Sequence, residues 1–366
     1  MRRGRWGGAV TWRTAAAAAV AAVAAAATVA TVPARRREGS KWFGWGHGAQ
    51  RTSGSRRGFP NQCLKAGAFV RNPRTMSVST QEPRSALVVL QDEPPKANAV
   101  ETQYEVHRRF DRMARLVGEP ALERLFRSHV MVIGLGGVGS FAAESLVRSG
   151  VGRVSLVDFD RICVTNTNRQ LQALKGMIGR TKAEVLTERL RAVNPQASIE
   201  PIVEFYSIET SEMLLSLKPD LIVDAIDNLT AKCHLLATCK ARSIAVVSSL
   251  GAAGRLEPGC IAVSDLAHTK VDPMGRVVRK ILRQNYDFPR GGEFGIPAVY
   301  SKEVAREPEP VTYDHGQGFR CVCPGGSNDF HSCEKRRVIY GTSSFVTGTF
   351  GLFCASEAVR YLSQAR

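Results

Sequence analysis

The sequence lacks the cysteine pattern of a structural metal site. Its nine cysteines are odd in number and irregularly spaced, and no two Cys-x-x-Cys pairs occur among them. We therefore expect no structural zinc, and we expect thiols that are mostly buried and unreactive in a reducing compartment. One alternative is a metal site formed by Cys321, Cys323 and Cys333 with the nearby His331.

Acidic side chains are almost absent from the first 80 residues. This stretch holds 14 Lys and Arg side chains against the single acid Glu38, whereas the other 286 residues hold 36 basic and 32 acidic side chains. Most of the net charge of +17 therefore belongs to the N-terminal extension. The overall charge is poor evidence that the folded part of the chain binds nucleic acid.

The N-terminal extension is rich in Arg and Ala, a composition typical of organelle transit peptides. We therefore expect an organellar protein, of the mitochondrion or the plastid. The alternatives are a cleaved secretory leader, a disordered tail, and a membrane anchor at residues 15–34, although a span needs about 20 apolar residues and alanine is only weakly hydrophobic. Residues 36–100 are typical of a linker. We assign residues 1–100 to targeting and linkage, and residues 101–366 to the folded domain.

A glycine-rich turn follows an apolar run in the middle of the chain. The run Val130–Ile133 suits a buried strand, and a helix is expected at Ser140–Ser149. The glycines between them are Gly134, Gly136, Gly137 and Gly139. Glycine permits positive φ and close approach of a phosphate, and a helix N-terminus attracts negative charge. Asp158 ends the next apolar run and can accept hydrogen bonds from both ribose hydroxyls, so this stretch predicts a nucleotide-binding half-fold.

Polar residues beyond Asp158 favour ATP over a nicotinamide dinucleotide. Arg169 offers a fork of N–H donors to phosphate oxygens, and Asn166 offers an amide donor. Lys182 begins the next predicted helix, and Asp227 with Asn228 follows the fourth predicted strand. We therefore expect an enzyme that handles a triphosphate.

Strands and helices alternate along the folded domain. This order predicts an α/β fold, Rossmann-like and doubly wound, with a mostly parallel sheet and a basic helical or hairpin part at the C-terminus. Ligands of such sheets bind beyond the carboxyl ends of the strands, where Asp227 is expected to hold Mg²⁺ against ATP. Asp224 is the alternative ligand, or a helix cap. Further strands are expected at 199–203, 221–225, 244–249 and 260–263, and helices at 103–117, 181–193, 210–217 and 341–360.

In their order along the chain, these motifs resemble those of the ubiquitin-activating-type adenylyltransferases, whose bacterial relatives adenylate small sulfur-carrier proteins. The matching positions are the glycine turn, Asp158 with Asp160, Asn166–Gln170, Lys182 and Asp224–Asn228. The stretches RRFDRMARLVGEPALERL, CVTNTNRQLQAL and VSDLAHTKVDPMGRVVRKIL resemble one branch more closely, the tRNA threonylcarbamoyladenosine dehydratases.

The closer resemblance covers about Arg109 to Tyr286 and resumes more weakly at Pro297 and Gly341. Ala253 and Glu257 stand where the branch suggests Gly and Asp, and residues 314–335 resemble an insertion. Both departures bear on substrate fit rather than on the ATP motif.

The resemblance implies a reaction next to the tRNA anticodon. The carboxylate of threonylcarbamoyladenosine attacks the α-phosphorus of Mg-ATP, and the carbamoyl group then closes a ring as AMP leaves. It implies catalytic roles for Asp227, Arg169 and Lys182. ATP contacts are implied for Gly134, Gly136, Gly137, Gly139, Asp158, Asn166, Arg169, Lys182, Asn228 and Arg112.

The resemblance also implies a homodimer, because Arg112 matches an arginine that reaches the ATP phosphates of the neighbouring subunit. The alternative is a surface arginine paired with an acid. Residues 129–250 would form the glycine-turn core, and residues 251–366 the part that faces tRNA and the dimer partner.

Basic residues recur at near-helical spacing between Thr269 and Arg283. Because the rest of the folded domain is nearly neutral, this cluster is the best candidate for binding tRNA phosphates, and the alternative is a solvated helix face. Its members are Lys270, Arg276, Arg279, Lys280 and Arg283.

Three functions remain open on the sequence. The first is the ATP-dependent tRNA dehydratase, and the second is an adenylyltransferase that activates the C-terminus of a sulfur-carrier or ubiquitin-like protein. The third is an NAD(P) oxidoreductase or a non-catalytic scaffold, which Arg169, Lys182 and Asp227 argue against. The missing cysteine pairs and the basic 270–283 segment favour the first.

Overall fold

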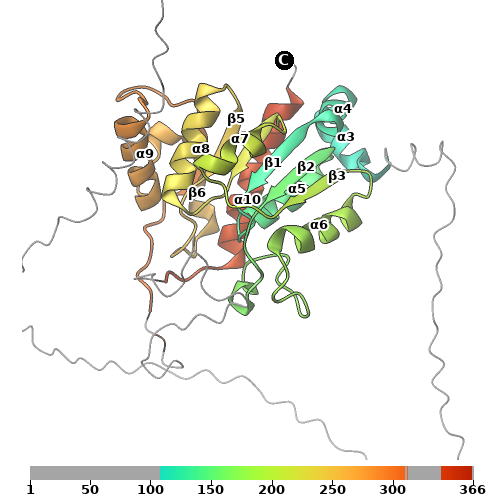
Figure 1. Ribbon diagram of the computed structural model, residues 1–366, viewed down its shortest axis with the longest axis horizontal. Coiled ribbons are helices and arrows are strands. Elements are labelled where there is room, and N and C mark those ends of the chain that lie inside the picture. Colours follow the sequence, from blue (N-terminus) through green and yellow to red (C-terminus); the bar gives the residue numbers. More distant parts are fainter. Residues whose placement is uncertain (1–107, 310, 312–338, 365–366) are drawn as a thin grey trace, which may run out of the picture. The chain divides into compact units, whose positions relative to one another are not determined.

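A seven-stranded sheet forms the centre of the computed structural model, which describes residues 108–309, 311 and 339–364 (Figure 1). The strand order is β3-β2-β1-β4-β5-β7-β6, and every neighbouring pair is parallel except β6 with β7. The strands are β1 (His129–Ile133), β2 (Arg153–Val157), β3 (Ser198–Ile202), β4 (Leu221–Asp224), β5 (Ala245–Ser249), β6 (Ile261–Asp265) and β7 (Pro297–Ser301).

Helices cover both faces of this sheet, as expected for a doubly wound fold (Figure 1). They are α3 (Asp111–Val117), α4 (Glu119–Arg127), α5 (Gly139–Arg148), α6 (Lys182–Val193), α7 (Ile208–Leu215), α8 (Leu229–Ala241), α9 (Pro273–Asn285) and α10 (Ser344–Ser363). All described residues belong to one compact unit. The predicted α/β, mostly parallel fold is confirmed.

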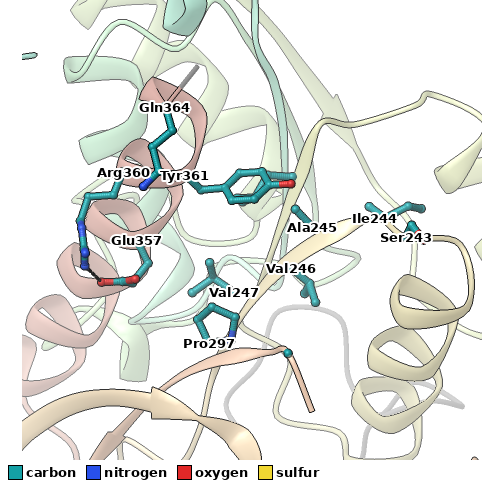
Figure 2. Close-up of a pocket in the computed structure, with 12 residues that line it drawn as sticks. Ser243, Ile244, Ala245, Val246, Val247, Pro297, Glu357, Arg360, Tyr361 and Gln364 are labelled. Carbon is teal, nitrogen blue, oxygen red and sulfur yellow. Dashed lines mark hydrogen bonds and ion pairs between the residues drawn. The ribbon is translucent and has the colours of Figure 1, made fainter. Parts of the chain in front are cut away.

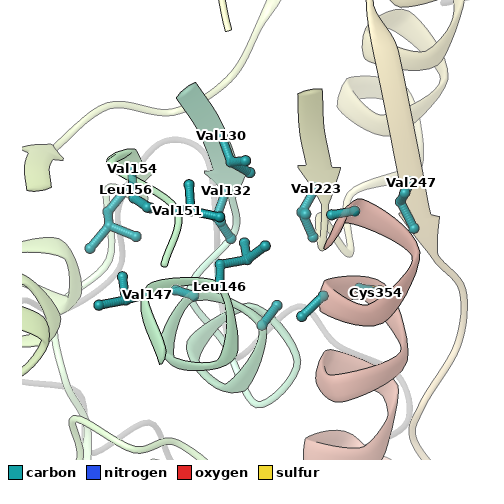
Figure 3. Packing of buried hydrophobic residues seen from close by; sticks show 14 of the residues in the cluster. Val130, Val132, Leu146, Val147, Val151, Val154, Leu156, Val223, Val247 and Cys354 are labelled. Carbon is teal, nitrogen blue, oxygen red and sulfur yellow. The ribbon is translucent and has the colours of Figure 1, made fainter. Parts of the chain in front are cut away.

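Two hydrophobic cores lie on opposite faces of the sheet, and β1 contributes to both. Val130 and Val132 pack into the core beneath α5, α6 and α10, whereas Met131 and Ile133 pack into the core beneath α7, α8 and α9. This division follows from the two-residue period of a strand. Figure 3 shows the first core, where Val130, Val132 and Val223 of the sheet lie near Leu146 of α5 and Cys354 of α10.

The long helix α10 packs along α5. Its residues Val346, Phe350, Cys354 and Ala358 recur every four positions and are fully buried. The fit requires a small residue at Gly351, because a Cβ there would lie 2.4 Å from the carbonyl oxygen of Val138. Helix α10 thus reaches the glycine turn that precedes α5.

Some predicted boundaries were wrong, and the helix caps explain why. Helix α9, which carries most of the basic cluster, begins at Pro273, because Asp272 caps it and proline suits the first position. Helix α7 begins at Ile208, because Ser207 accepts a hydrogen bond from the Thr210 N–H. Neither α8 nor β7 was assigned from the sequence.

Several predictions fall partly or wholly outside the described residues. These concern the targeting segment and linker at 1–100 with the possible anchor at 15–34, the start of the helix predicted at 103–117, and the insertion at 314–335 with the possible metal group near His331. Within the described part of the chain, no helix combines the length and the apolar character that crossing a bilayer requires.

Candidate active site

The predicted site residues converge where the order of the sheet reverses. The glycine turn follows β1, Asp158 follows β2 and Asp227 follows β4, and these three strands are neighbours in the sheet. Because β1, β2 and β4 are parallel, their carboxyl ends meet at one edge. Such a switch point is where doubly wound sheets bind ligands.

The glycine turn is shaped by contacts that exclude side chains. Gly134 has φ of 90°, and a Cβ there would lie 2.6 Å from the carbonyl oxygen of Ala225 after β4. A Cβ on Gly139 would lie 1.8 Å from the carbonyl oxygen of Gly134. At Gly136, by contrast, the nearest atom is the Gln170 Nε2 at 4.0 Å, so an anion can approach the backbone there. The four glycines therefore divide into structural positions and at least one position open to a ligand.

Asp158 holds the glycine turn in addition to its predicted contact with ribose. Its carboxylate accepts the Leu135 N–H at 2.6 Å and the Asp160 N–H at 2.8 Å, and only 7% of the residue is exposed. Burial raises the pKa of the Asp158 carboxyl, while the nearby Lys182 and the two N–H donors act against that shift. Each carboxylate oxygen keeps a lone pair for a ribose hydroxyl.

Lys182 is not the solvated lysine that its sequence context alone would suggest. The side chain is 6% exposed, and its Nζ lies 2.7 Å from Asp160 Oδ2 and 3.8 Å from Asp158 Oδ1. Burial acts to lower the pKa of the ammonium group, but Asp158, Asp160 and Asp227 outweigh it and raise the pKa above its ordinary value. Lys182 is therefore a fixed positive charge at the carboxyl edge of the sheet.

The loop after β2 arranges the predicted phosphate ligands. The Asn166 side chain is buried and accepts the Cys163 N–H at 2.9 Å, which fixes the short 3-10 helix Val164–Asn166. The Arg169 side chain is half-buried, and its guanidinium donates to the carbonyl oxygen of Thr165 at 2.8 Å. Asn166 thus has a structural task beside its predicted role, while Arg169 lies at the surface of the loop, next to Gly137.

Asp227 and its neighbours have separate tasks. Asp227 is solvent-exposed, whereas Asn228 caps α8 by accepting the Ala231 N–H at 3.0 Å. Asp224 is fully buried and accepts hydrogen bonds from Lys232 and Ser248. The suggestion that Asp224 caps the helix was therefore wrong, and its engaged carboxylate is a poor metal ligand.

The donor set at this edge fits a magnesium ion shared with a nucleotide. Mg²⁺ usually takes one or two carboxylates and completes its shell with phosphates and water. Asp227 can supply such a carboxylate. Among the described residues, no group of three or more His, Cys, Asp and Glu side chains forms a self-sufficient metal site.

A small cavity that the sequence analysis missed lies beside Asp158. It measures about 230 Å³ and is lined by Phe159, Val203, Glu204, Phe205, Ser207 and Thr210. The rings of Phe159 and Phe205 meet edge to face, with centroids 5.1 Å apart. No motif marks these residues, and only their positions just after β2 and β3 could have indicated the cavity.

A larger cavity lies at the opposite edge of the sheet, away from the site residues (Figure 2). It measures about 340 Å³, and the amino ends of β4 and β5 meet the end of α10 there. Arg360 forms an ion pair with Glu357 at 2.7 Å on its rim. Cavity size alone would therefore have pointed to the wrong edge.

Arg112 does not join the other predicted site residues within the same chain. It is exposed on α3, and nearby Arg109 donates to the carbonyl oxygen of Val193 at the end of α6, which precedes the amino end of β3. Helix α3 therefore lies at the amino edge of the sheet, opposite the glycine turn (Figure 1).

The predicted basic cluster divides into outward and inward members. Lys270, Arg276 and Lys280 are exposed. Arg279 is half-buried against the Thr269 hydroxyl, and burial lowers the pKa of its guanidinium. Arg283 lies over the ring of Phe294, at 5.2 Å from its centroid. Arg279 and Arg283 thus also hold α9 in place, and phosphate binding by the five basic residues stays a prediction.

The fold and this site define the protein as a Rossmann-like nucleotide-binding protein with a glycine turn, a buried lysine and an exposed acid at the switch point. The chain belongs to the ThiF family, whose profile matches residues 110–366. A tRNA threonylcarbamoyladenosine dehydratase of Haemophilus influenzae is 38% identical over 69% of this chain and 92% of that protein.

A solved structure supports the same relationship. The E. coli tRNA N6-threonylcarbamoyladenosine dehydratase in complex with ATP is 34% identical, with a TM-score of 0.60, over 70% of this chain and 94% of that chain. The E. coli molybdopterin-synthase adenylyltransferase is 32% identical, but over only 44% of this chain and 63% of that protein. This chain thus matches the dehydratases over nearly their whole length, and it matches the adenylyltransferase over a smaller part of its length.

Proposed function

We propose that this protein is an ATP-dependent tRNA threonylcarbamoyladenosine dehydratase. The observation that carries the proposal is the buried Lys182, which lies with Asp160 and Asp158 beside an exposed Asp227 at the switch point. A fixed cation next to an anion-binding turn suits an enzyme that cleaves a triphosphate. Relatives of this name match almost end to end and include one solved with ATP.

ATP fits the described residues from the small cavity to the glycine turn. The adenine would lie in the cavity lined by Phe159 and Phe205, and the ribose hydroxyls would bond to Asp158. The phosphates would lie over Gly136 and the N-terminus of α5, where Arg169 and Lys182 supply positive charge. Mg²⁺ held by Asp227 would offset the negative charge of the departing pyrophosphate.

The chemistry proceeds in two balanced steps. A carboxylate oxygen of the modified adenosine attacks the α-phosphorus, the bond from the α-phosphorus to the α,β-bridging oxygen breaks, and pyrophosphate leaves with that oxygen. A carbamoyl nitrogen then attacks the activated carbonyl carbon and loses its proton, and AMP leaves with the former carboxylate oxygen. The ring product is lighter than the substrate by one water. Lys182 and Arg169 stabilise the charge that moves along the phosphates.

The tRNA would approach the same edge of the sheet over α9. Lys270, Arg276 and Lys280 are exposed there and offer phosphate contacts. Helix α9 is tied to the turn after β5 by the buried ion pair of Arg255 with Asp272, which holds the basic face next to the site. Removing one of these exposed cations should weaken tRNA binding and flatten its salt dependence.

We further propose a homodimer in which Arg112 completes the ATP site of the other subunit. In its own chain this arginine lies at the amino edge of the sheet, so any contact with ATP must come from a second copy.

We also propose that the Arg-rich, Ala-rich N-terminal segment directs the protein to a mitochondrion or plastid, with membrane association through residues 15–34 as the alternative. A fusion of residues 1–100 to a fluorescent protein tests this, and a diffuse cytosolic signal would contradict it.

The reaction is tested by incubating the protein with ATP and tRNA that carries threonylcarbamoyladenosine. The expected result is release of AMP and pyrophosphate together with a nucleoside lighter by one water. AMP release that requires a small carrier protein, with no change in the tRNA, would support the alternative function, activation of a sulfur-carrier or ubiquitin-like protein.

A further inference from the structure

Val271 has an unusual backbone conformation for its residue type. Four non-glycine residues in the described part of the chain have positive φ, and three of them, Lys218, Ser243 and Asp287, lie just after the ends of α7, α8 and α9. Left-handed residues are common there. Val271, with φ of 68°, instead precedes α9, and a β-branched side chain makes this conformation a genuine outlier.

The turn around Val271 is closed by a three-residue hydrogen bond. The Asp272 N–H donates to the carbonyl oxygen of Lys270 at 2.7 Å. With positive φ at the central residue, this is the rare and strained form of the γ-turn. Such strain persists only where the surrounding structure over-determines it, and it concentrates at functional sites.

Buried contacts to Asp272 hold this strained turn. Asp272 is 2% exposed, and its carboxylate accepts the Gly275 N–H at 2.7 Å and the Arg255 guanidinium at 2.8 Å. A Cβ on Gly251 would lie 3.1 Å from Asp272 Oδ2, which places the turn beside the end of β5. Strand β5 is the neighbour of β4, so the turn lies at the same edge as Asp227.

The strained turn carries an exposed apolar side chain in a basic segment. Val271 is 43% exposed, the exposed Lys270 directly precedes it, and the exposed Arg276 follows five positions later. The acid of the segment, Asp272, is buried. Cations bind phosphates, and an exposed apolar side chain in the same segment can contact the face of a base, so this segment fits single-stranded RNA.

We propose that Val271 contacts a base of the anticodon loop and helps to keep the modified adenosine out of the base stack. This inference rests on the proposed function. Enzymes that act on a nucleotide inside a stacked strand must extrude it, and apolar side chains placed between bases favour the unstacked state. The carboxylate of the extruded nucleoside can then reach the α-phosphate at the carboxyl edge.

The test replaces Val271 with glycine, which adopts positive φ without strain. Val271→Gly should leave the melting temperature unchanged or higher, because the strain is relieved. It should lower kcat/KM for the modified tRNA about tenfold, in line with the loss of a base contact, and leave KM for ATP unchanged. Val271→Ile, which keeps an apolar side chain at this position, should have a kcat/KM close to that of the native protein.

A matched control and a spectroscopic readout separate contact from structure. Lys218→Gly relieves positive φ at the other edge of the sheet and should not change activity. An anticodon stem-loop with 2-aminopurine beside the modified adenosine should fluoresce more strongly when bound to the native protein than to Val271→Gly.

Three results would overturn the proposal. The first is a kcat/KM for Val271→Gly equal to that of the native protein. The second is that Val271→Gly and Val271→Asn both lose activity only to the extent that they lose stability. The third is a native protein without tRNA-dependent turnover, and only that result would overturn the proposed function as well.

Discussion

Lys232 on α8 and Asp224 at the end of β4 form a fully buried ion pair, with Lys232 Nζ 2.6 Å from Asp224 Oδ2. The ammonium group also donates to the carbonyl oxygen of Ser249 at 2.9 Å, and the Ser248 hydroxyl donates to Asp224 at 2.7 Å. The pair therefore ties α8, β4 and β5 together directly beneath the segment that carries Asp227. The site is built on this polar network inside the core.

Breaking the ion pair on one side should destabilise the protein strongly. In Lys232→Met, Asp224 keeps a buried charge without its cation, and we expect a loss of about 3–5 kcal/mol in the free energy of unfolding. Lys232→Met combined with Asp224→Asn should recover much of it, because no buried charge remains. Denaturant titration measures both variants, and a loss well below 1 kcal/mol in the single variant would contradict this account.

Acid should destabilise the protein partly through His129. Burial, aided by the Arg153 guanidinium, lowers the pKa of this side chain below its ordinary value of 6.5. Between the pKa of the folded chain and that of the unfolded chain, the unfolded chain binds more protons than the folded one. The contribution of His129 to the free energy of unfolding is therefore fully present above pH 6.5, and it is lost as the pH falls through the pKa of the folded chain. His129→Gln should show a shallower fall in stability between about pH 7 and pH 5. Parallel curves for the variant and the native protein would refute this.

Asp227 and Asp158 should differ in the kinetic constant that they control. Asp227→Asn keeps the shape but weakens the metal contact and should lower kcat by orders of magnitude, because the metal acts on charge that develops during the reaction. Asp158→Ala should mainly raise KM for ATP, since ribose is held about equally in the ground and transition states. Its tie to the Leu135 N–H adds a loss of stability that circular dichroism would detect. Near-normal turnover of folded Asp227→Asn at saturating Mg-ATP would remove Asp227 from the metal site.

Arg112 should act across the dimer. The variants Arg112→Ala and Asp227→Ala should each be inactive, and mixing them should restore part of the activity, because one of the two sites in a hybrid dimer keeps both residues. Size-exclusion chromatography and tagged subunits confirm that hybrids form. Hybrids without activity would show that Arg112 does not act on the other subunit's site.

The sequence predicted those features of this molecule that depend on the order of motifs along the chain. Gly134, Asp158 and Lys182 occur at the expected points after predicted strands and at the start of a predicted helix, and the structure places them at one edge. Apolar periodicity located most of the strands. These predictions succeed because the carboxyl ends of parallel strands meet wherever the strands are neighbours.

Features that depend on distant partners could not be predicted. Nothing near Lys232 in the sequence identifies Asp224 as its partner, and helical spacing alone does not show that Arg279 and Arg283 turn toward Thr269 and Phe294. The positive φ of Val271 was equally hidden, because its residue type argues against that conformation.

The central claim is that the carboxylate activated by ATP belongs to tRNA. It is tested most directly by the exchange of labelled pyrophosphate into ATP, measured in parallel with threonylcarbamoyladenosine-containing tRNA, with the same tRNA lacking the modification, and with a sulfur-carrier protein that ends in a free carboxylate. The account predicts exchange with the modified tRNA alone, and its loss in Asp227→Asn. Exchange driven by the carrier protein, with none from the modified tRNA, would contradict it.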